Sequence, residues 1–242
     1  LIFTIDGEDT RDIDDAISLE VNEKGNRVLG VHIADVGEYV KVGSVIDHEA
    51  FNRGTSVYFP NSVLPMLPRE LSNGICSLNE RVDRLALSVL MEMDENANIL
   101  SYKIGESIIN SKRRYTYTEV HKVLMGDKDA VARNSQFVDT LVEMNKLAMQ
   151  LGKLRKNRGE ILFNIPEVYV SVDSLGRVVE LKKREVNESH KMIESFMISA
   201  NETIAHEFLK NKIPFVYRVH EVPDGEKIDR FTHVLDSAGI QY

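Results

Sequence analysis

The first fifteen residues hold the feature that most constrains this chain, a dense run of acids. Six carboxylates fall within residues 6–15, and only Arg11 offsets their charge locally. Like charges this close repel one another and raise one another's pKa. A fold tolerates such a run when solvent surrounds it or when a cation neutralises it. Because hard divalent cations such as Mg²⁺ take oxygen ligands, including substrate phosphate, the run predicts a site for metal-assisted phosphoryl chemistry.

The flanking residues place this run between two strands. Residues 1–5 are apolar and β-branched, and residues 16–21 alternate apolar with polar side chains, so both segments favour β-structure. Asp6 lies where the first strand ends, and Gly7 with the polar residues after it indicates a turn. If the loop folds back, Asp6 meets the later carboxylates around one or two ions.

Two other interpretations apply to the same run. The first is a solvated acidic loop, which is the usual setting of a charge run, although the hydrophobic flanks and short aspartate side chains favour the metal site. In extended backbone, Asp12 and Asp14 would share one face and Asp15 would take the other. The second is an EF-hand, which is excluded because Ile17 occupies the twelfth position counted from Asp6, where Glu is required.

The segment from Thr4 to Ala16 closely resembles the signature of the RNB domain, the catalytic domain of the ribonuclease II and ribonuclease R family. Further segments resemble that family in the same order along the chain: 31–36, 53–60, 64–68, 71–78, 158–159, 193–197, 200–202 and 217–221. Several long motifs in one order are more specific than one short pattern, and these cover nearly the whole chain. The resemblance is closer to the ribonuclease R branch than to ribonuclease II.

This resemblance implies an activity, a cofactor and a partner. The family degrades single-stranded RNA hydrolytically from its 3′ end and releases nucleoside 5′-monophosphates. The implied cofactor is Mg²⁺, with Mn²⁺ as the alternative, and the implied partner is single-stranded RNA, with no membrane and no obligate protein partner. Carried onto this chain, Asp6 and Asp15 would be direct metal ligands, and Asp12 would complete or support the site. Asp14 would lie closest to the chemistry and would position a second metal or the water.

The same resemblance assigns residues to RNA contacts. Tyr58 matches an aromatic residue that stacks on RNA near its 3′ end, although from the sequence alone its ring would simply pack. Tyr117 matches a position that approaches the terminal ribose. Glu194, by itself an exposed helical glutamate, matches one that binds the 2′-hydroxyl, the group that separates RNA from DNA. A second stacking position falls near Leu162 or Phe163, and if it is Leu162, only Phe163 could substitute.

The pattern of apolar residues predicts one α+β domain over residues 1–242, with a β-rich, barrel-like mixed sheet in the first half and surrounding helices in the second. The predicted strands are 1–5, 15–21, 27–34, 84–94 and 98–109. Proline and glycine residues predict an irregular loop or short turns over 60–80. Helical periodicity begins at Thr116, a hairpin is predicted around 173–176, and a long helix is predicted over 189–211.

Composition is compatible with this interpretation. The 242 residues are 43% hydrophobic and 28% charged, which is ordinary for a globular protein with a sizeable core. No stretch approaches the roughly 18 apolar residues of a membrane span, and no signal peptide is visible. The single Cys76 is expected to be a small buried residue and fits a reducing cytoplasm. His32, on an apolar strand, is expected to be a core histidine rather than a metal ligand.

The net charge of −8 argues mildly against nucleic acid as a partner, because proteins that bind phosphate backbones usually show a basic surface. The acidic run accounts for much of this deficit. Basic residues also gather over 112–114 and 153–158, where they would either follow phosphates or form solvated faces, and both interpretations stay open.

In the family, the domain continues past the position that matches Ile240, into an arginine-rich segment that contacts the scissile phosphate, and small β-barrel RNA-binding modules flank it. We therefore expect a fragment of a larger ribonuclease R-like enzyme, inactive or weakly active alone. Two alternatives stay open, a non-catalytic RNA-binding or scaffolding module of the same fold and a metal-dependent phosphohydrolase of small phosphate esters. The four aspartates argue against the first, and Tyr58, Tyr117 and Glu194 would argue against the second.

Overall fold

The computed structural model describes residues 1–161, 168–173, 175–183 and 185–241, so that Leu162 and Phe163 lie outside the described residues. The chain forms two units, Leu1–Ile204 and Ala205–Tyr242. Helices and strands both contribute to the first unit, and the predicted α+β class is confirmed. None of the described helices is long and apolar enough to cross a membrane.

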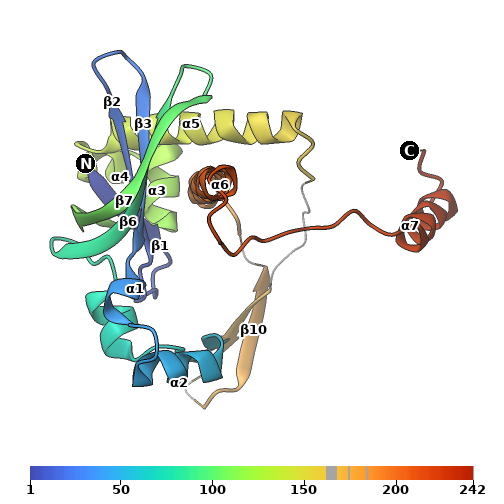
Figure 1. Ribbon diagram of the computed structural model, residues 1–242, viewed down its shortest axis with the longest axis horizontal. Helices are drawn as coiled ribbons and strands as arrows, with labels where there is room; N and C mark the ends of the chain where they lie inside the picture. Colours follow the sequence, from blue (N-terminus) through green and yellow to red (C-terminus); the bar gives the residue numbers. More distant parts are fainter. Residues whose placement is uncertain (162–167, 174, 184, 242) are drawn as a thin grey trace. The chain divides into compact units, whose positions relative to one another are not determined.

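The first unit is built on a six-stranded mixed sheet in the order β7-β6-β3-β2-β1-β8 (Figure 1). Its strands are β1 (Ile2–Asp6), β2 (Asp15–Val21), β3 (Arg27–Ala34), β6 (Asp83–Met93), β7 (Ile99–Asn110) and β8 (Arg114–Thr116). Five of them lie within one residue of the predicted bounds, because apolar, β-branched runs such as β1 and alternating segments such as β2 both favour strands. Neighbouring strands are antiparallel except for β1 and β8, which run parallel and pair Asp6 with Thr116.

Helices and two hairpins complete the described structure. The helices are α1 (Val36–Tyr39), α2 (Val45–Arg53), α3 (Tyr117–Leu124), α4 (Lys128–Arg133), α5 (Val138–Asn157), α6 (Glu188–Lys210) and α7 (Gly225–Ser237), with a π-helical segment η1 (Glu70–Ile75). The hairpins are β4 (Val57–Phe59) with β5 (Ser62–Leu64) and β9 (Val168–Val172) with β10 (Val178–Lys183). The hairpin predicted around 173–176 and the long helix over 189–211 are confirmed, whereas 60–80 contains β5 and η1 rather than only irregular loop or short turns.

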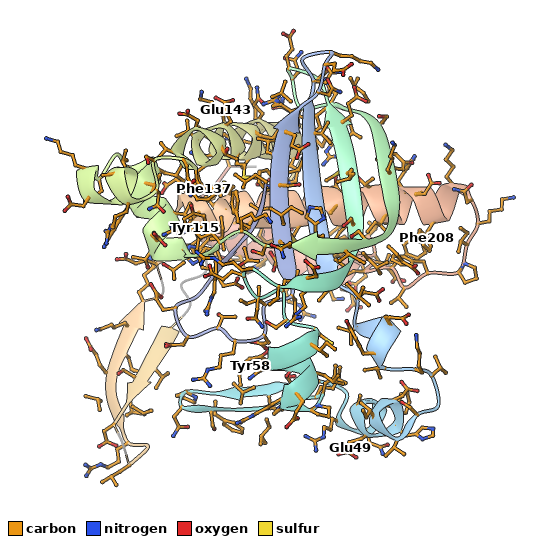
Figure 2. All side chains as sticks on the ribbon, turned by 90° about the vertical axis from the view of Figure 1, so that its left-hand side faces the viewer. Glu49, Tyr58, Tyr115, Phe137, Glu143 and Phe208 are labelled. Carbon is orange, nitrogen blue, oxygen red and sulfur yellow. The ribbon has the colours of Figure 1, made fainter. Side chains whose placement is uncertain are left out.

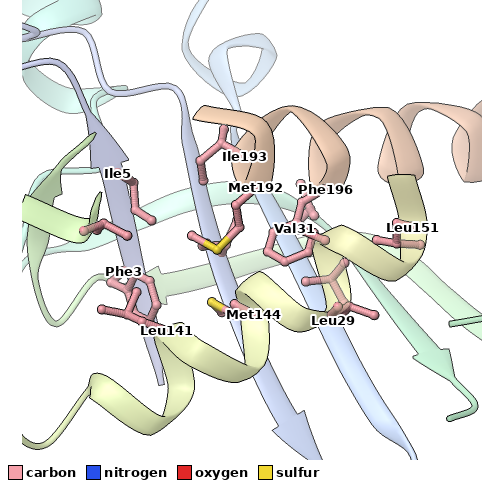
Figure 3. Close-up of a cluster of buried hydrophobic side chains, with 14 of the residues drawn as sticks. Phe3, Ile5, Leu29, Val31, Leu141, Met144, Leu151, Met192, Ile193 and Phe196 are labelled. Atoms are coloured by element: carbon pink, nitrogen blue, oxygen red, sulfur yellow. The ribbon is translucent and has the colours of Figure 1, made fainter. Parts of the chain in front are cut away.

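The main core lies between one face of the sheet and the helices α3, α5 and α6. Figure 3 shows its central side chains: Phe3 and Ile5 of β1, Leu29 and Val31 of β3, Leu141, Met144 and Leu151 of α5, and Met192, Ile193 and Phe196 of α6. The apolar residues of α5 and α6 recur every three or four positions, so each helix buries one stripe against the strands. Phe3 and Tyr115 meet edge to face with ring centroids 5.5 Å apart, and Phe137 completes an aromatic trio. Figure 2 labels Tyr115 and Phe137. This packing fixes β1, the strand that leads into the acidic run, and β8, its parallel neighbour.

The opposite face of the sheet carries a buried polar chain around His32. Its Nε2 lies 3.1 Å from Oγ of Ser18, and its Nδ1 lies 2.6 Å from Oγ of Ser88, which in turn contacts Ser107. Gly30 makes room for this contact, since a Cβ there would lie 2.3 Å from Oγ of Ser18. Burial lowers the pKa of His32 to about 4 and keeps it neutral. The prediction of a hydrogen-bonded core histidine is confirmed, and Cys76 is likewise buried as predicted.

Candidate active site

The acidic run forms a loop, residues 7–14, between β1 and β2, which we call the acidic loop. Asp6 ends β1 and is only 8% exposed, whereas Asp15 begins β2 and is half-buried. Between them, Asp12 is half-buried and Asp14 is exposed. The strands therefore carry the two inner carboxylates, and the loop carries the two outer ones.

The acidic loop is anchored from below by Ile13. This side chain is fully buried in a small apolar cluster with Ala16 and Leu78, away from the main core. Oγ of Ser77 accepts a hydrogen bond from the Ile13 amide at 3.1 Å and donates one to the Arg11 carbonyl at 2.9 Å. An apolar residue within the acidic run thus anchors the loop by its buried side chain.

A second anchor comes from Arg114 on β8. Its Nη2 lies 3.1 Å from the Gly7 carbonyl oxygen, 3.3 Å from that of Glu8 and 2.5 Å from that of Thr10. The parallel pairing of β8 with β1 brings this side chain beside a loop more than 100 residues away in sequence. Sequence reasoning noted Arg114 only as part of a basic run, because no local pattern shows that its acceptors are main-chain oxygens.

The beginning of α3 also adjoins the acidic loop. Thr116 pairs with Asp6 across the strands, and its Oγ1 accepts a hydrogen bond from the Glu119 amide, so helix α3 starts at Tyr117. Oγ1 of Thr118 donates a hydrogen bond to Oε1 of Glu8 at 2.6 Å. The first turn of α3 is therefore tied to the loop that carries the candidate metal ligands.

The pKa values of the aspartates record how much negative charge is gathered here. Burial, together with the nearby carboxylates of Asp15 and Asp14, raises the pKa of Asp6 to about 7, against a lowering effect of Arg114. Burial and then Asp14 raise the pKa of Asp15 to about 6. Burial and then Asp12 raise that of Asp14. The structure thus brings all four predicted aspartates into one electrostatic neighbourhood.

These residues fit a hard divalent cation in donor type and in charge. Oδ2 of Asp6 is buried and has no hydrogen-bond partner in the described structure, so it is open to a bound ion. Oxygen donors from carboxylates are what Mg²⁺ and Mn²⁺ prefer. Among the described residues, however, no three His, Cys, Asp or Glu side chains are grouped closely enough to form a ready-made cage. The four aspartates are neighbours whose negative charges repel one another.

Tyr58 lies on the β4–β5 hairpin with its side chain 65% exposed (Figure 2). Its hydroxyl donates a hydrogen bond to Oδ2 of Asp12 at 2.9 Å, and this bond is the main reason that its pKa is raised. The predicted RNA-stacking residue is thus joined to a predicted metal ligand, a link that 46 residues of sequence separation conceal.

Tyr117 lies against α6, the helix that also carries Glu194. The rings of Tyr117 and His190 are stacked, with centroids 4.0 Å apart and planes 11° from parallel. Nδ1 of His190 lies 2.8 Å from Oδ1 of Asn187 at the start of α6. Glu194 is exposed one turn after His190, and residues four apart share a helix face, so it lies on the side of α6 that meets Tyr117. Phe163, the remaining predicted RNA contact, lies outside the described residues.

The arginines of the two basic runs have partners within the chain. Arg113 forms an ion pair with Glu119 at 2.7 Å, and Arg114 holds the acidic loop. In the second run, Arg155 pairs with Glu160, while Arg158 contacts both carboxylate oxygens of Glu202. These arginines therefore serve contacts within the chain, which neither interpretation of the two runs anticipated.

The whole chain, residues 1–242, matches the family model of the RNB domain. The chain belongs to the RNB-domain family. Ribonuclease R of Thermotoga maritima is 48% identical over 242 residues, which is all of this chain and 34% of that protein. RNase R of Mycoplasma genitalium, solved in complex with ribose-methylated single-stranded RNA, superposes with a TM-score of 0.89 at 32% identity and covers 99% of this chain and 37% of that one.

The RNB fold also occurs in a protein described as a pseudonuclease. Yeast Ssd1 superposes with a TM-score of 0.76 at 20% identity and covers 98% of this chain and 28% of that one, a likeness that shows the fold alone. The chain spans about a third of the length of the ribonucleases R that it matches. The resemblance inferred from the sequence is therefore confirmed at the level of the family.

Proposed function

We propose that this chain carries the acidic centre of a 3′-to-5′ exoribonuclease that hydrolyses single-stranded RNA with the help of Mg²⁺ and releases nucleoside 5′-monophosphates. The observation that carries the proposal is the buried, unpartnered carboxylate oxygen of Asp6 among three further aspartates, in an RNB-family chain. Support comes from the relatives, which are named ribonuclease R, one of them solved with single-stranded RNA.

We assign Asp6, Asp12, Asp14 and Asp15 to the cation, with Mg²⁺ expected and Mn²⁺ as the alternative. When bound, the cation supplies charge that polarises the scissile phosphate and lowers the pKa of the attacking water. Asp6 and Asp15 are the more buried pair, and their raised pKa values mean that a cation relieves a cost of ionisation already present. Asp14 is the exposed carboxylate and therefore the one best placed to orient the water.

Three residues are assigned to the RNA itself. The exposed ring of Tyr58 is available to stack on a base, a contact that tolerates any sequence because every base has a flat face. Tyr117, held by its stack on His190, would approach the terminal ribose. Glu194, on the same helix face as His190, would bind the 2′-hydroxyl and so select RNA over DNA. Phe163 stays a candidate for a second stacking contact.

The decisive experiment places this chain in a full-length enzyme. The matching segment of Thermotoga maritima ribonuclease R is replaced by this chain, and a 5′-labelled single-stranded RNA is followed on a gel with and without Mg²⁺. We expect a Mg²⁺-dependent ladder that shortens from the 3′ end. Asp14→Asn should abolish turnover and leave RNA binding largely intact, whereas equal loss of binding would contradict its assigned role.

The isolated chain serves as the second arm of the same assay. Because it spans about a third of its relatives, we expect weak cleavage or none. Strong Mg²⁺-dependent cleavage that Asp14→Asn removes would refute this expectation and support the exoribonuclease. A folded chimera that binds RNA without cleaving it would favour the non-catalytic module. Hydrolysis of a chromogenic phosphate ester that RNA does not inhibit would favour the small-ester phosphohydrolase.

A further inference from the structure

Arg114 is a half-buried cation that contacts the acidic loop through its main chain. The three hydrogen bonds from Nη2 reach the carbonyl oxygens of Gly7, Glu8 and Thr10. Its Nε is buried, so the side chain lies against the protein rather than extending into solvent. These bonds engage main-chain oxygens rather than side-chain carboxylates, so Arg114 acts on the path of the backbone between β1 and β2.

The three carbonyls that Arg114 binds lie between Asp6 and Asp12. Gly7 follows Asp6 directly, and Thr10 precedes Asp12 by two residues. Residues 7–10 are therefore the part of the loop that sets where Asp12 lies relative to Asp6. The other end of the loop has its own anchor, since Ile13 is buried and the Ala34 amide donates to the Asp14 carbonyl at 2.9 Å. At the end nearer β1, Arg114 holds the main chain, while Thr118 holds only the side chain of Glu8.

A positive charge beside a cation site repels the cation and so opposes its binding. Arg114 lowers the pKa of Asp6, so it competes electrostatically with any cation that Asp6 binds. A chain that needed only to offset six acids could place its basic residues further out in solvent. The guanidinium is useful here because its outer nitrogen reaches one bond further than a lysine ammonium and carries its donors in a fixed plane.

We propose that Arg114 is a positioning residue of the acidic site, which fixes the backbone of residues 7–10 and thereby sets the spacing of the aspartates for a divalent cation. This inference rests on the proposed function, because it assumes that the aspartates bind a cation. It predicts the direction in which cation affinity changes when Arg114 is lost. If position dominates, loss of Arg114 weakens cation binding, whereas if its charge dominates, loss of Arg114 strengthens cation binding.

The test is Mn²⁺ titration of the 242-residue chain, followed by the electron paramagnetic resonance of free Mn²⁺. Arg114→Lys keeps the charge but falls one bond short of the carbonyls, and Arg114→Gln removes both charge and reach. We expect both variants to bind Mn²⁺ about tenfold more weakly or worse, the loss typical of residues that orient metal ligands. Arg113→Lys is the matched control, because Arg113 pairs with Glu119 and lies over the Tyr115 ring instead of the loop.

Amide hydrogen exchange supplies a readout that is independent of the cation. In cation-free buffer, Arg114→Lys should speed exchange of the amides of residues 7–12 and leave the core strands unchanged, and it carries the test if Arg114→Gln does not fold. Tighter Mn²⁺ binding by Arg114→Gln with unchanged binding by Arg114→Lys would overturn the inference. Unchanged binding by both, while Asp6→Asn abolishes it, would also overturn it and spare the proposed function. Absence of Mn²⁺ binding in the unsubstituted chain would count against the proposed function and the inference together.

Discussion

The acidic loop and the β4–β5 hairpin meet at one hydrogen bond, from Tyr58 to Asp12, and are held in opposite ways. The loop is polar, yet it is anchored by the buried side chain of Ile13 and the half-buried side chain of Arg114. The hairpin is rich in apolar residues, yet most of its large side chains are exposed: Val57, Tyr58, Phe59 and Leu64. Polarity therefore does not predict which of the two segments is fixed.

The difference matches what each segment would have to do. Carboxylates that hold a cation must keep their spacing to within a fraction of an ångström. Stacking on a base is tolerant of sequence and works from an exposed ring. The anchored acidic loop thus carries the proposed metal ligands, and the exposed aromatic hairpin carries the proposed RNA-stacking residue. Substitutions in the two segments should then have different kinds of effect.

The largest effect should follow from removing the buried anchor of the loop. Ile13→Ala deletes a fully buried side chain and should lower the free energy of unfolding by about 2–5 kcal/mol. Phe59→Ala, in the exposed hairpin, should change it by less than about 0.5 kcal/mol. Urea unfolding followed by circular dichroism measures both. Equal losses for the two variants would show that the hairpin is packed as firmly as the loop and would remove the contrast.

A somewhat smaller effect should depend on pH. The pKa of Asp6 is raised from 3.8 to about 7 in the folded chain, so the folded state binds a proton more strongly than the unfolded state does. The free energy of unfolding should therefore fall as the pH rises from about 4 to about 7. Asp6→Asn removes this cost and should stabilise the cation-free protein at pH 8 by up to about 4 kcal/mol, with little change near pH 4.

Urea unfolding in EDTA at three pH values tests this prediction. Asp9→Asn is the matched control, because Asp9 is an exposed acid of the same loop. Added Mg²⁺ should raise the stability of the unsubstituted chain at pH 8 and should do little for Asp6→Asn. A pH slope that Asp6→Asn leaves untouched would mean that the carboxylate is not held in a costly ionised state.

Much of the fold follows from periodicity in the sequence. The strand β2 lies where its alternating residues predict, β3 lies at its predicted bounds, and the apolar stripe of α5 is buried as its spacing requires. The exceptions are short or lack periodicity. β4 and β5 have three residues each, too few to establish an alternation, and the π-helical segment Glu70–Ile75 contains a glycine and lies after three prolines.

The candidate site divides in a similar way. The aspartates could be named because like charges so close together demand an explanation in any fold. The residues that hold them could not be named, since the side chains of Ser77 and Arg114 bond main-chain atoms of the loop. Every residue has such atoms, so no sequence pattern marks these contacts. His190 beside Tyr117 depends on how α6 packs against α3, which local sequence does not encode. The sequence thus predicted that the aspartates belong together, whereas the residues that hold them needed the structure.

The smallest effects should come from Tyr58, where the ring and the hydroxyl have separate partners. Tyr58→Ala removes both and should weaken binding of a single-stranded RNA by about 1–3 kcal/mol, the usual contribution of a stacked base. Tyr58→Phe keeps the ring and should bind RNA as before. It loses the hydrogen bond to Asp12, an exposed contact whose loss should weaken Mn²⁺ binding by about 1 kcal/mol or less. Fluorescence anisotropy and Mn²⁺ titration measure the two affinities.

The role of the Tyr58 hydroxyl can be tested in a protein that already carries Asp12→Asn. If the hydroxyl acts only by orienting the Asp12 carboxylate, adding Tyr58→Phe to Asp12→Asn should cause no further loss of Mn²⁺ affinity. If Tyr58→Phe instead weakens RNA binding as much as Tyr58→Ala, the hydroxyl rather than the ring grips RNA. The hairpin would then need a fixed geometry of its own, and the division between a rigid acidic loop and a tolerant aromatic hairpin would fail at the hydrogen bond that joins them.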